Sequence, residues 1–386
     1  MSVNNILVIN SGSSSVKFKL FSNLNPVAEG IVERIGNHPR IRYKISNGPR
    51  RLEKNTKIKN HKDAIKKILK ILEENGLGKN YIDAVGHRVV HGGKLSKSCI
   101  VTRKIEKIIE KNSELAPLHN PANLAGIRAV KSIMNVPNVA VFDTAFHTTM
   151  PEKSKLYALP YKWFTKYNIM RYGFHGTSHK YVFNQAKKLL RRHNKVITCH
   201  LGNGSSITAI LNGKSIDTSM GFTPLEGIMM GTRSGSFDPS VVEFLTRKGL
   251  SIKEIMEFAN KKSGLLGVSG ISNDMRDILK SKSKRAELAV EMFSYIAAKT
   301  IASYAASLNG VDAIVFTAGI GENSPEIRKK ICGYLEFLGV KIDDGKNSKN
   351  ETIISSNDSK VKILVIPTNE ELQIAIETKN VIEKHK

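Results

Sequence analysis

The hydrophobic pattern alternates between short apolar runs and longer segments whose apolar residues recur at helical spacing. Several runs are continuously apolar, which is typical of strands buried on both faces of a sheet. The segments 62–75 and 285–310 have the helical spacing; the first stops before Gly76 and the second ends at Gly310. This alternation indicates an α/β protein. The runs of strand length are 5–10, 16–21, 83–90, 136–142, 195–201, 206–211, 311–317 and 361–367.

Two of these runs begin a repeated pattern. "VINSGSSSVKFKLF" (8–21) and "CHLGNGSSITAIL" (199–211) both read as strand, small-residue turn, strand. Glycine permits close backbone approach, so such turns can offer N–H groups and hydroxyls to phosphate oxygens. An ordinary hairpin is the alternative for either turn alone, since Asn-Gly is a common hairpin turn. The pair favours a duplicated chain with a ligand cleft between its halves.

A third glycine-rich turn follows the run at 311–317. It reads "TAGIGENSPEIRKK" (317–330), with Ser324 as a candidate N-cap and Pro325 at the first position of a helix. A strand, a glycine turn and a helix start are typical of a nucleotide or anion site. None of the three turns has the Gly-x-x-x-x-Gly-Lys-Ser/Thr pattern of a Walker loop.

Composition narrows the class of protein. The 386 residues carry a net charge of +26, so nucleic-acid binding has to be weighed. The lysines are spread along the chain and follow no nucleic-acid-binding pattern, so we expect a solvated basic surface and no specific nucleic-acid partner. No basic leader or long apolar run is present, and three scattered cysteines match no metal spacing. These features predict a cytoplasmic protein without a membrane partner.

Polar residues with catalytic potential cluster where the apolar runs end. Arg88 lies inside an apolar run, and a buried arginine requires an ion pair or an anionic ligand. Each of the other polar residues at these run ends has a structural explanation as an alternative, such as a turn cap, a core histidine or a surface ion pair. Their common position favours one active site. They are Asp143, His175, Arg233, Glu370 and Glu371.

With these residues in place, the chain resembles the acetokinase family of the sugar-kinase, actin and heat-shock ATPase superfamily. The family usually reads Asp where this chain has Ser236, which leaves the local loop geometry open. The matching stretches are "VINSGSSSVKF", "GHRVVHGG", "LAPLHNP", "VFDTAFH", "RYGFHGTSH", "HLGNGSS", "MGTRSG", "NDMRD", "FTAGIGENS" and "IPTNEE".

The resemblance implies two duplicated ribonuclease-H-like domains of the actin and sugar-kinase type, with the nucleotide in a cleft between them. It places an N-terminal domain at 1–147 plus 372–386 and a nucleotide-binding C-terminal domain at 148–371. A homodimer is implied by the resemblance only.

The implied reaction is reversible, Mg²⁺-dependent phosphoryl transfer between ATP and acetate, giving ADP and acetyl phosphate, with Mn²⁺ as a possible substitute. A carboxylate is already a nucleophile, so positioning and charge stabilisation should suffice. Propionate is the alternative acceptor, because one methylene is worth only about 1 to 3 kcal/mol of discrimination. A non-catalytic nucleotide switch of the same fold is a distant alternative, and Arg88 and Arg233 together favour the enzyme.

The resemblance also assigns roles residue by residue. Asp143 has a second possible role in orienting the acetate and the arginines, and Glu370 is preferred to Glu371 by motif match alone. The catalytic residues are Asp143, Arg88, Arg233, His175 and His119. The acetate pocket is formed by Arg88, Val90, Leu118, Phe174 and Pro224. The metal ligands are Asn10, Glu370 and Asp143. The nucleotide is bound by Asn10, Lys17, His200, Leu201, Gly202, Asn203, Gly204, Asp274, Met275, Arg276, Gly319, Ile320, Gly321, Glu322 and Asn323.

Overall fold

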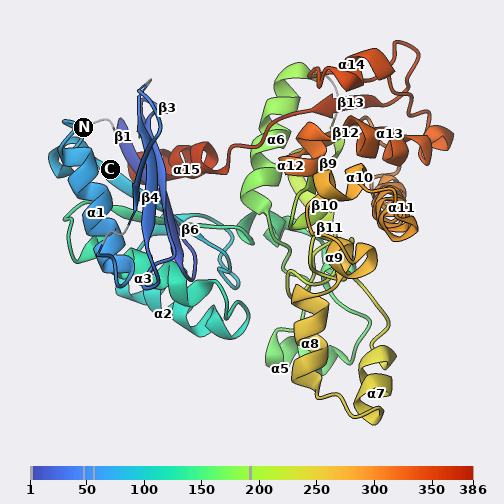
Figure 1. Cartoon of the computed structure of the whole chain (residues 1–386), viewed down its shortest axis with the longest axis horizontal. Helices are drawn as coiled ribbons and strands as arrows, with labels where there is room; N and C mark the ends of the chain where they lie inside the picture. Colours follow the sequence, from blue (N-terminus) through green and yellow to red (C-terminus); the bar gives the residue numbers. More distant parts are fainter. Residues whose placement is uncertain (1–2, 47, 55–56, 191–193, 386) are drawn as a thin grey trace. The chain divides into compact units, whose positions relative to one another are not determined.

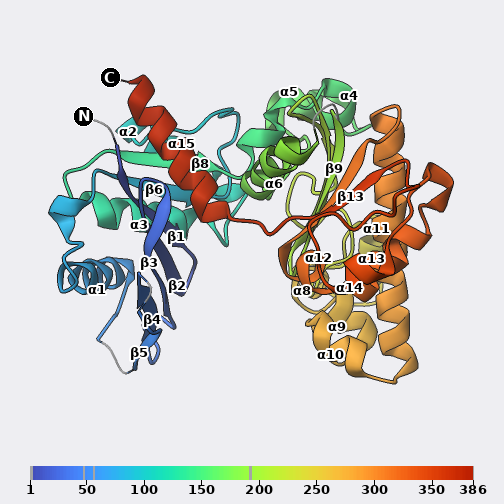
Figure 2. The ribbon, with the colours of Figure 1, turned by 90° about the horizontal axis from the view of Figure 1, so that it is seen from above.

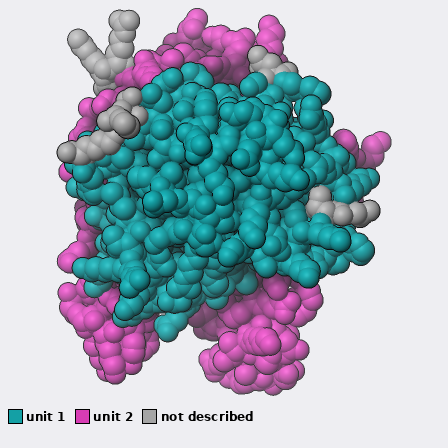
Figure 3. All heavy atoms as spheres, turned by 90° about the vertical axis from the view of Figure 1, so that its left-hand side faces the viewer, with its two compact units in different colours: residues 1–148, 369–386 teal, residues 149–368 magenta. Residues whose placement is uncertain are grey.

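The computed structural model describes residues 3–46, 48–54, 57–190 and 194–385, which include every predicted site residue. The chain divides into two compact units, coloured separately in Figure 3: Met1–Thr148 with Asn369–Lys386, and Thr149–Thr368. The domain boundaries expected from the sequence, 147/148 and 371/372, lie beside these divisions. Glu370 and Glu371 therefore belong to the first unit.

The first unit is built on a mixed sheet. Its strands are β1 (Asn5–Ser11), β2 (Ser15–Ser22), β3 (Asn25–Glu33), β4 (Arg40–Ile45), β5 (Arg51–Lys54), β6 (Ala84–Val89), β7 (Cys99–Ile100) and β8 (Asn138–Phe142). Over the described residues the strand order is β5-β4-β3-β2-β1-β6-β8-β7 (Figure 1). β1 and β2 form an antiparallel hairpin, whereas β1, β6 and β8 run parallel. The carboxyl ends of β6 and β8, which carry Arg88 and precede Asp143, therefore lie at the same edge.

Helices cover both faces of this sheet (Figures 1 and 2). Alternate residues of a strand point to opposite faces, so Leu7 and Ile9 pack in one apolar cluster with α1 and α3. Ile6 and Val8 pack in another with α15. The helical segments are α1 (His61–Glu73), α2 (Arg103–Lys111), α3 (Asn120–Lys131) and α15 (Glu370–Lys384), with 3₁₀ turns at Lys79–Tyr81, Asn112–Glu114 and Ala145–Thr149.

The sheet of the second unit repeats the same plan. Its strands are β9 (Lys195–Leu201), β10 (Ser205–Leu211), β11 (Lys214–Thr218), β12 (Ala313–Thr317) and β13 (Lys362–Val365). Over the described residues their order is β11-β10-β9-β12-β13, which matches β3-β2-β1-β6-β8 strand for strand. In the first unit β1 pairs antiparallel with β2 and parallel with β6. In the second unit β9 likewise pairs antiparallel with β10 and parallel with β12. The repeated turn pattern in the sequence thus corresponds to a repeated sheet.

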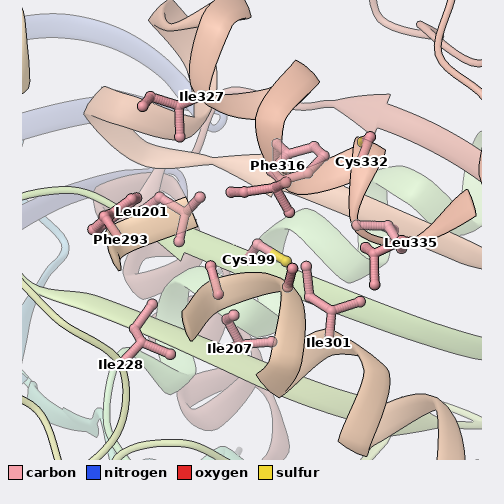
Figure 4. Close-up of a cluster of buried hydrophobic side chains, with 14 of the residues drawn as sticks. Cys199, Leu201, Ile207, Ile228, Phe293, Ile301, Phe316, Ile327, Cys332 and Leu335 are labelled. Atoms are coloured by element: carbon pink, nitrogen blue, oxygen red, sulfur yellow. The ribbon is translucent and has the colours of Figure 1, made fainter. Parts of the chain in front are cut away.

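The core of the second unit lies between the sheet and its longest described helix, α11 (Lys284–Ser307). Figure 4 shows Cys199 and Leu201 of β9 among buried side chains that include Ile301 of α11. The alternate residues Thr198 and His200 face α6 (Gly176–Leu189). The remaining helical segments are α4 (Glu152–Lys155), α5 (Tyr161–Tyr167), α7 (Ser240–Arg247), α8 (Ile252–Lys261), α9 (Gly264–Ser269), α10 (Met275–Lys280), α12 (Ala318–Asn323), α13 (Pro325–Gly333), Glu336–Leu338 and α14 (Asp344–Ser348).

One turn differs from its expected form. The sequence predicted an irregular glycine turn before a helix at Pro325, and α13 does begin there. The preceding residues 318–323 are themselves the short helix α12, which begins directly at the end of β12. The motif predicted to bind the nucleotide therefore lies in a short helix rather than in a loop.

A close packing contact joins α15 to the sheet of the first unit. Gly86 of β6 faces α15, and a Cβ built on it would overlap Thr378 Oγ1 and lie 2.9 Å from Ile374 Cγ2. Thr378 and Ile374 are themselves fully or almost fully buried. Glycine at this position lets α15, which begins at Glu370, approach the strand that carries Arg88.

We predict that Gly86→Ala lowers the free energy of unfolding by about 1 to 3 kcal/mol, because the added methyl overpacks the β6–α15 contact. Gly333→Ala is the matched control, since a Cβ there meets nothing within 4 Å. Urea unfolding of both variants measures the difference. Equal stability of the two variants would contradict the proposed tight contact.

Candidate active site

The first unit brings three of the predicted residues into one charged cluster. Arg88 lies in β6, Asp143 directly follows β8, and Glu370 is the first residue of α15. Arg88 Nη2 donates to Asp143 Oδ2 at 2.6 Å, and Arg88 Nε donates to the same oxygen at 3.1 Å. Glu370 Oε2 lies 3.9 Å from Arg88 Nε. The partner that the sequence required for Arg88 is therefore Asp143.

The electrostatics of this cluster are unbalanced, because two carboxylates share one guanidinium. Burial raises the pKa of Glu370 to about 7 against the opposing charge of Arg88, and the charge of Asp143 adds to the rise. Burial alone would lower the pKa of Arg88, but the charges of Asp143 and Glu370 outweigh it and hold that pKa above its usual value. The cluster therefore favours a further cation or a proton.

The other predicted residues of the first unit differ in how deeply they are buried. Asn10 and Lys17 are opposite each other in the β1–β2 hairpin, and the charge of Lys17 acts on Glu370. Val90 is buried just beyond β6, whereas Leu118 is 65% exposed. His119 immediately precedes α3.

Asn123 of α3 was missed by the sequence analysis. Its Oδ1 accepts from the Val90 N–H at 3.1 Å, and its Nδ2 donates to Ser11 O at 2.7 Å. It therefore ties the segment after Arg88 to the first small-residue turn. The only sequence signal was an uncharged amide on an apolar helix face, which is too common to single out.

In the second unit, His175 sits at the start of α6 in a strained conformation. Its φ is +55°, in the left-handed region that non-glycine residues seldom adopt. Its ring stacks on that of His200 with the centroids 4.2 Å apart. Phe174, which precedes His175 in the chain, is buried. Strain of this kind is common where a side chain must be aimed at a functional site.

Three residues that the sequence analysis did not select form a hydrogen-bonded chain that begins at the ring of His175. His175 Nδ1 lies 2.9 Å from Ser206 Oγ, which also lies 2.8 Å from His179 Nε2. His179 Nδ1 lies 2.7 Å from Thr198 Oγ1. His179 follows His175 by four residues on one helix, a spacing in the motif that could have identified it.

Arg233 lies beside the second small-residue turn. A Cβ on Gly204 would lie 3.7 Å from Arg233 Nη1 and 3.4 Å from His175 Nε2. Arg233 Nη1 donates to Pro224 O at 3.3 Å, and among the described residues no acidic side chain forms a salt bridge with it. Burial lowers its pKa below the usual value. The arrangement leaves this guanidinium with unused donors for an anionic ligand.

A cavity of about 390 Å³ in the second unit collects most of the predicted nucleotide residues. Asp274 and Arg276 pair with each other at its edge, with Nη2 and Oδ2 2.5 Å apart, and hydrogen bonds from Arg276 lower the pKa of Asp274 to about 2. Asn273, missed from the sequence, donates to Asn203 Oδ1 at 2.9 Å. The lining residues are Gly202, Asn203, Asn273, Asp274, Met275, Arg276, Leu279, Gly319, Ile320, Asn323 and Ser324.

Seven residues predicted for the nucleotide do not line this cavity. Two of them, Asn10 and Lys17, belong to the first unit. Leu201 is fully buried in the core, and His200 stacks on His175. Gly204 lies between His175 and Arg233. Gly321 and Glu322 belong to α12, and the Glu322 carboxylate accepts the N–H of Ala318.

Ser236 closes its own loop. Its hydroxyl accepts the N–H of Gly227 at 3.0 Å, and its N–H donates to Gly227 O at 2.9 Å. Gly235 before it has a φ of +76°. A serine oxygen therefore provides the acceptor at this position.

Two searches over the described residues gave negative results. No helix among them is long and apolar enough to cross a membrane. In the same ranges, no group of three or more His, Cys, Asp or Glu side chains is arranged to hold a metal ion.

Comparison with known proteins identifies the family. Residues 5–376 match the model of the Acetokinase family. The acetate kinase of Thermoanaerobacterium thermosaccharolyticum is 54% identical, covering 99% of this chain and all of that protein. The acetate kinase of Methanosarcina acetivorans is also 54% identical, over 98% of this chain and 97% of that protein.

Solved structures agree with this assignment. The crystal structure of Porphyromonas gingivalis acetate kinase has a TM-score of 0.92 at 43% identity, covering 98% of this chain and 100% of its own. That of a propionate kinase from Francisella tularensis has a TM-score of 0.93 at 47% identity, covering 99% and 100%. The fold class and the resemblance stated from the sequence are confirmed, and the chain belongs to the acetokinase family.

Proposed function

We propose that this chain catalyses reversible phosphoryl transfer between ATP and acetate, giving ADP and acetyl phosphate. The observation that carries the proposal is the 54% identity to a relative named acetate kinase over essentially the whole of both chains. A hydroxamate assay tests it, because hydroxylamine traps acetyl phosphate formed from ATP and acetate. Absence of hydroxamate from the purified, folded protein would contradict the proposal.

Propionate remains the second candidate acceptor. The similarity to a propionate kinase, at 47% identity, supports keeping it. Running the hydroxamate assay with acetate, propionate and butyrate in parallel compares the three values of kcat/KM. A higher value for propionate than for acetate would make propionate the main substrate.

The two arginines have complementary roles in this reaction. A guanidinium presents a planar fork that matches the oxygens of a carboxylate or a phosphoryl group. Arg233, with no acidic partner among the described residues, would bind the transferring phosphoryl group and stabilise its charge. Arg88, held by Asp143, would orient the acetate carboxylate for in-line attack. No general base is required, because the attacking carboxylate is already ionised.

His175 would donate a hydrogen bond to the phosphoryl group from Nε2, which lies on the Gly204 side of the ring. Ser206 engages the opposite nitrogen, Nδ1, and so fixes the ring orientation. His119 would contribute near the substrate, as the family motif implies. The acetate methyl group would lie against Val90, Leu118, Phe174 and Pro224.

A divalent cation fits the cluster in the first unit. Asp143 and Glu370 offer the oxygen ligands that Mg²⁺ prefers, with Asn10 as a third. Burial raises the pKa of Glu370 and the charge of Asp143 adds to the rise, so a bound cation would stabilise its charged form. When bound, the ion would neutralise charge on the nucleotide phosphates. Mn²⁺ has similar ligand preferences and could replace it.

The cavity of the second unit would hold the nucleotide. Its neutral polar lining from Gly202, Asn203, Gly319 and Asn323 suits a ribose and base. A Cβ on Gly319 would meet nothing within 4 Å, so this glycine leaves room that a ligand can use. We further propose, on family resemblance, that the protein is a cytoplasmic homodimer.

We predict that Arg233→Ala reduces kcat by about a hundredfold or more, as expected for loss of a charged contact in the transition state. The stability of this variant should change little, because no acidic partner is left behind.

Arg88→Ala should reduce kcat similarly but also destabilise the fold, because it leaves Asp143, whose side chain is 2% exposed, without its partner. Arg247→Ala on α7 is the surface control. Near-wild-type turnover in Arg88→Ala or Arg233→Ala would remove the substituted arginine from the mechanism.

The raised pKa of Glu370 predicts a pH dependence of stability in metal-free protein. The folded state binds this proton more tightly than the unfolded state, so the stabilisation is present at low pH and is lost as pH rises toward about 7. We expect Glu370→Gln to remove this decline, which should be on the order of 1 to 3 kcal/mol. Urea unfolding with EDTA from pH 5 to 8 measures it, with Glu383→Gln, at the exposed far end of α15, as control. Parallel profiles for wild type and Glu370→Gln would contradict the assignment.

Val90 should limit the length of the acyl group. Val90→Ala is expected to raise the propionate-to-acetate ratio of kcat/KM severalfold, which is below the roughly 10- to 200-fold upper range that one methylene supplies. The change should come mainly from a lower KM for propionate. Val89→Ala is the control, because Val89 points to the opposite side of the strand and packs in the core. A lower melting temperature with an unchanged ratio would make Val90 an ordinary core residue.

A further inference from the structure

The helix α12 begins with a strained residue. Ala318 has a φ of +64°, in the left-handed region that residues with a side chain seldom occupy, and it is buried. Such a conformation persists only where surrounding contacts hold it. The contact here is a hydrogen bond from the Ala318 N–H to Glu322 Oε1 at 2.7 Å.

The same oxygen of Glu322 has two further donors. Thr317 Oγ1, at the end of β12, donates at 3.3 Å, and the Thr368 N–H, beyond β13, donates at 3.0 Å. One carboxylate thus ties the start of α12 to the ends of two neighbouring parallel strands. It points into the unit, although the motif match predicted a nucleotide contact.

Arg328 of α13 holds the other end of α12. It is fully buried, and it donates to Gly321 O at 2.8 Å and to Glu322 O at 3.0 Å. Its remaining donors bind Asn347 of α14, at 2.8 and 2.9 Å, and Asn350 Oδ1 at 2.7 Å. No carboxylate among the described residues forms a salt bridge with it. Burying an arginine on neutral acceptors is costly, and this cost favours a role for Arg328 in positioning α12.

The cavity lies on the other side of α12. Gly319, Ile320 and Asn323 line it, whereas Glu322 and Arg328 do not. The residues of α12 that would touch a nucleotide are therefore different from the residues that hold the helix in place, although the two kinds lie close together in the sequence.

We propose that Glu322 and Arg328 are positioning residues, which hold α12 in its nucleotide-binding form without contacting the nucleotide. The proposal rests on the proposed function, because it takes the cavity to be the site for ATP and ADP. It predicts that their loss affects nucleotide binding selectively.

The principal test is Glu322→Ala, which leaves the N–H groups of Ala318 and Thr368 without their acceptor. We expect KM for ATP and the Kd for ADP, the latter by calorimetry without acetate, to rise about tenfold or more. KM for acetate should stay within about twofold. Glu326→Ala is the matched control, because Glu326 is an exposed glutamate at the start of α13.

Conservative variants separate positioning from general stability. Glu322→Gln keeps an acceptor oxygen and should restore the nucleotide constants to within about threefold of wild type. Arg328→Lys cannot span its acceptors and should weaken ADP binding, whereas Lys329→Met, which breaks only the exposed Lys329–Asp344 pair between α13 and α14, should not. If Glu322→Ala is insoluble, the shorter carboxylate of Glu322→Asp takes its place.

Two results would overturn the inference. One is wild-type ADP affinity in folded Glu322→Ala or Glu322→Asp. The other is an equal rise in KM for ATP and acetate together with a lower melting temperature. A wild-type protein that binds ADP but forms no acetyl phosphate would contradict the proposed function, and the calorimetric comparison would still decide the roles of Glu322 and Arg328.

Discussion

The ion pair between Arg88 and Asp143 is the interaction on which the charge balance of the first unit's buried cluster depends. Asp143 is almost completely buried, and an unpaired carboxylate in such a place would be strongly unfavourable. The parallel pairing of β6 with β8 brings the two side chains together. Because Asp143 occupies the guanidinium at close range, Glu370 at 3.9 Å is only partly neutralised. The fold itself thus sets the excess negative charge that makes this cluster suitable for a cation.

The two units use one sheet plan for different chemistry. In the first, the strand ends carry charges whose balance is decided by pairing. In the second, the corresponding hairpin carries Ser206 and His200, whose neutral hydrogen bonds and ring stacking set the orientation of His175. Arg233 is the charged exception, and it has no acidic partner among the described residues. The two units therefore share a sheet plan but carry these polar groups on different strands of it.

The sequence was sufficient for the strands that are buried on both faces, for the family and for the class of reaction. It was insufficient for β3, β4 and β5, because segments such as "RIRYKI" mix charged and apolar residues on a partly exposed sheet region. Motif matching also cannot tell which way a side chain points. Glu322 lies in the motif predicted for the nucleotide, yet its carboxylate bonds to the backbone of its own unit. Ser206 of β10 and His179 of α6 are 27 residues apart in the sequence, and only the folded structure shows that they touch. The roles assigned to the site residues stay predictions.

The discontinuity of the first unit has a consequence for protein synthesis. Its sheet emerges from the ribosome early, but α15, which covers one of its faces, is encoded after the whole of Thr149–Thr368. At roughly 5 to 20 residues per second, that interval lasts about ten to forty seconds. During it, Ile6, Val8, Val139 and Val141 have no α15 to pack against. The nascent chain must therefore keep an apolar sheet face from aggregating until its last helix arrives.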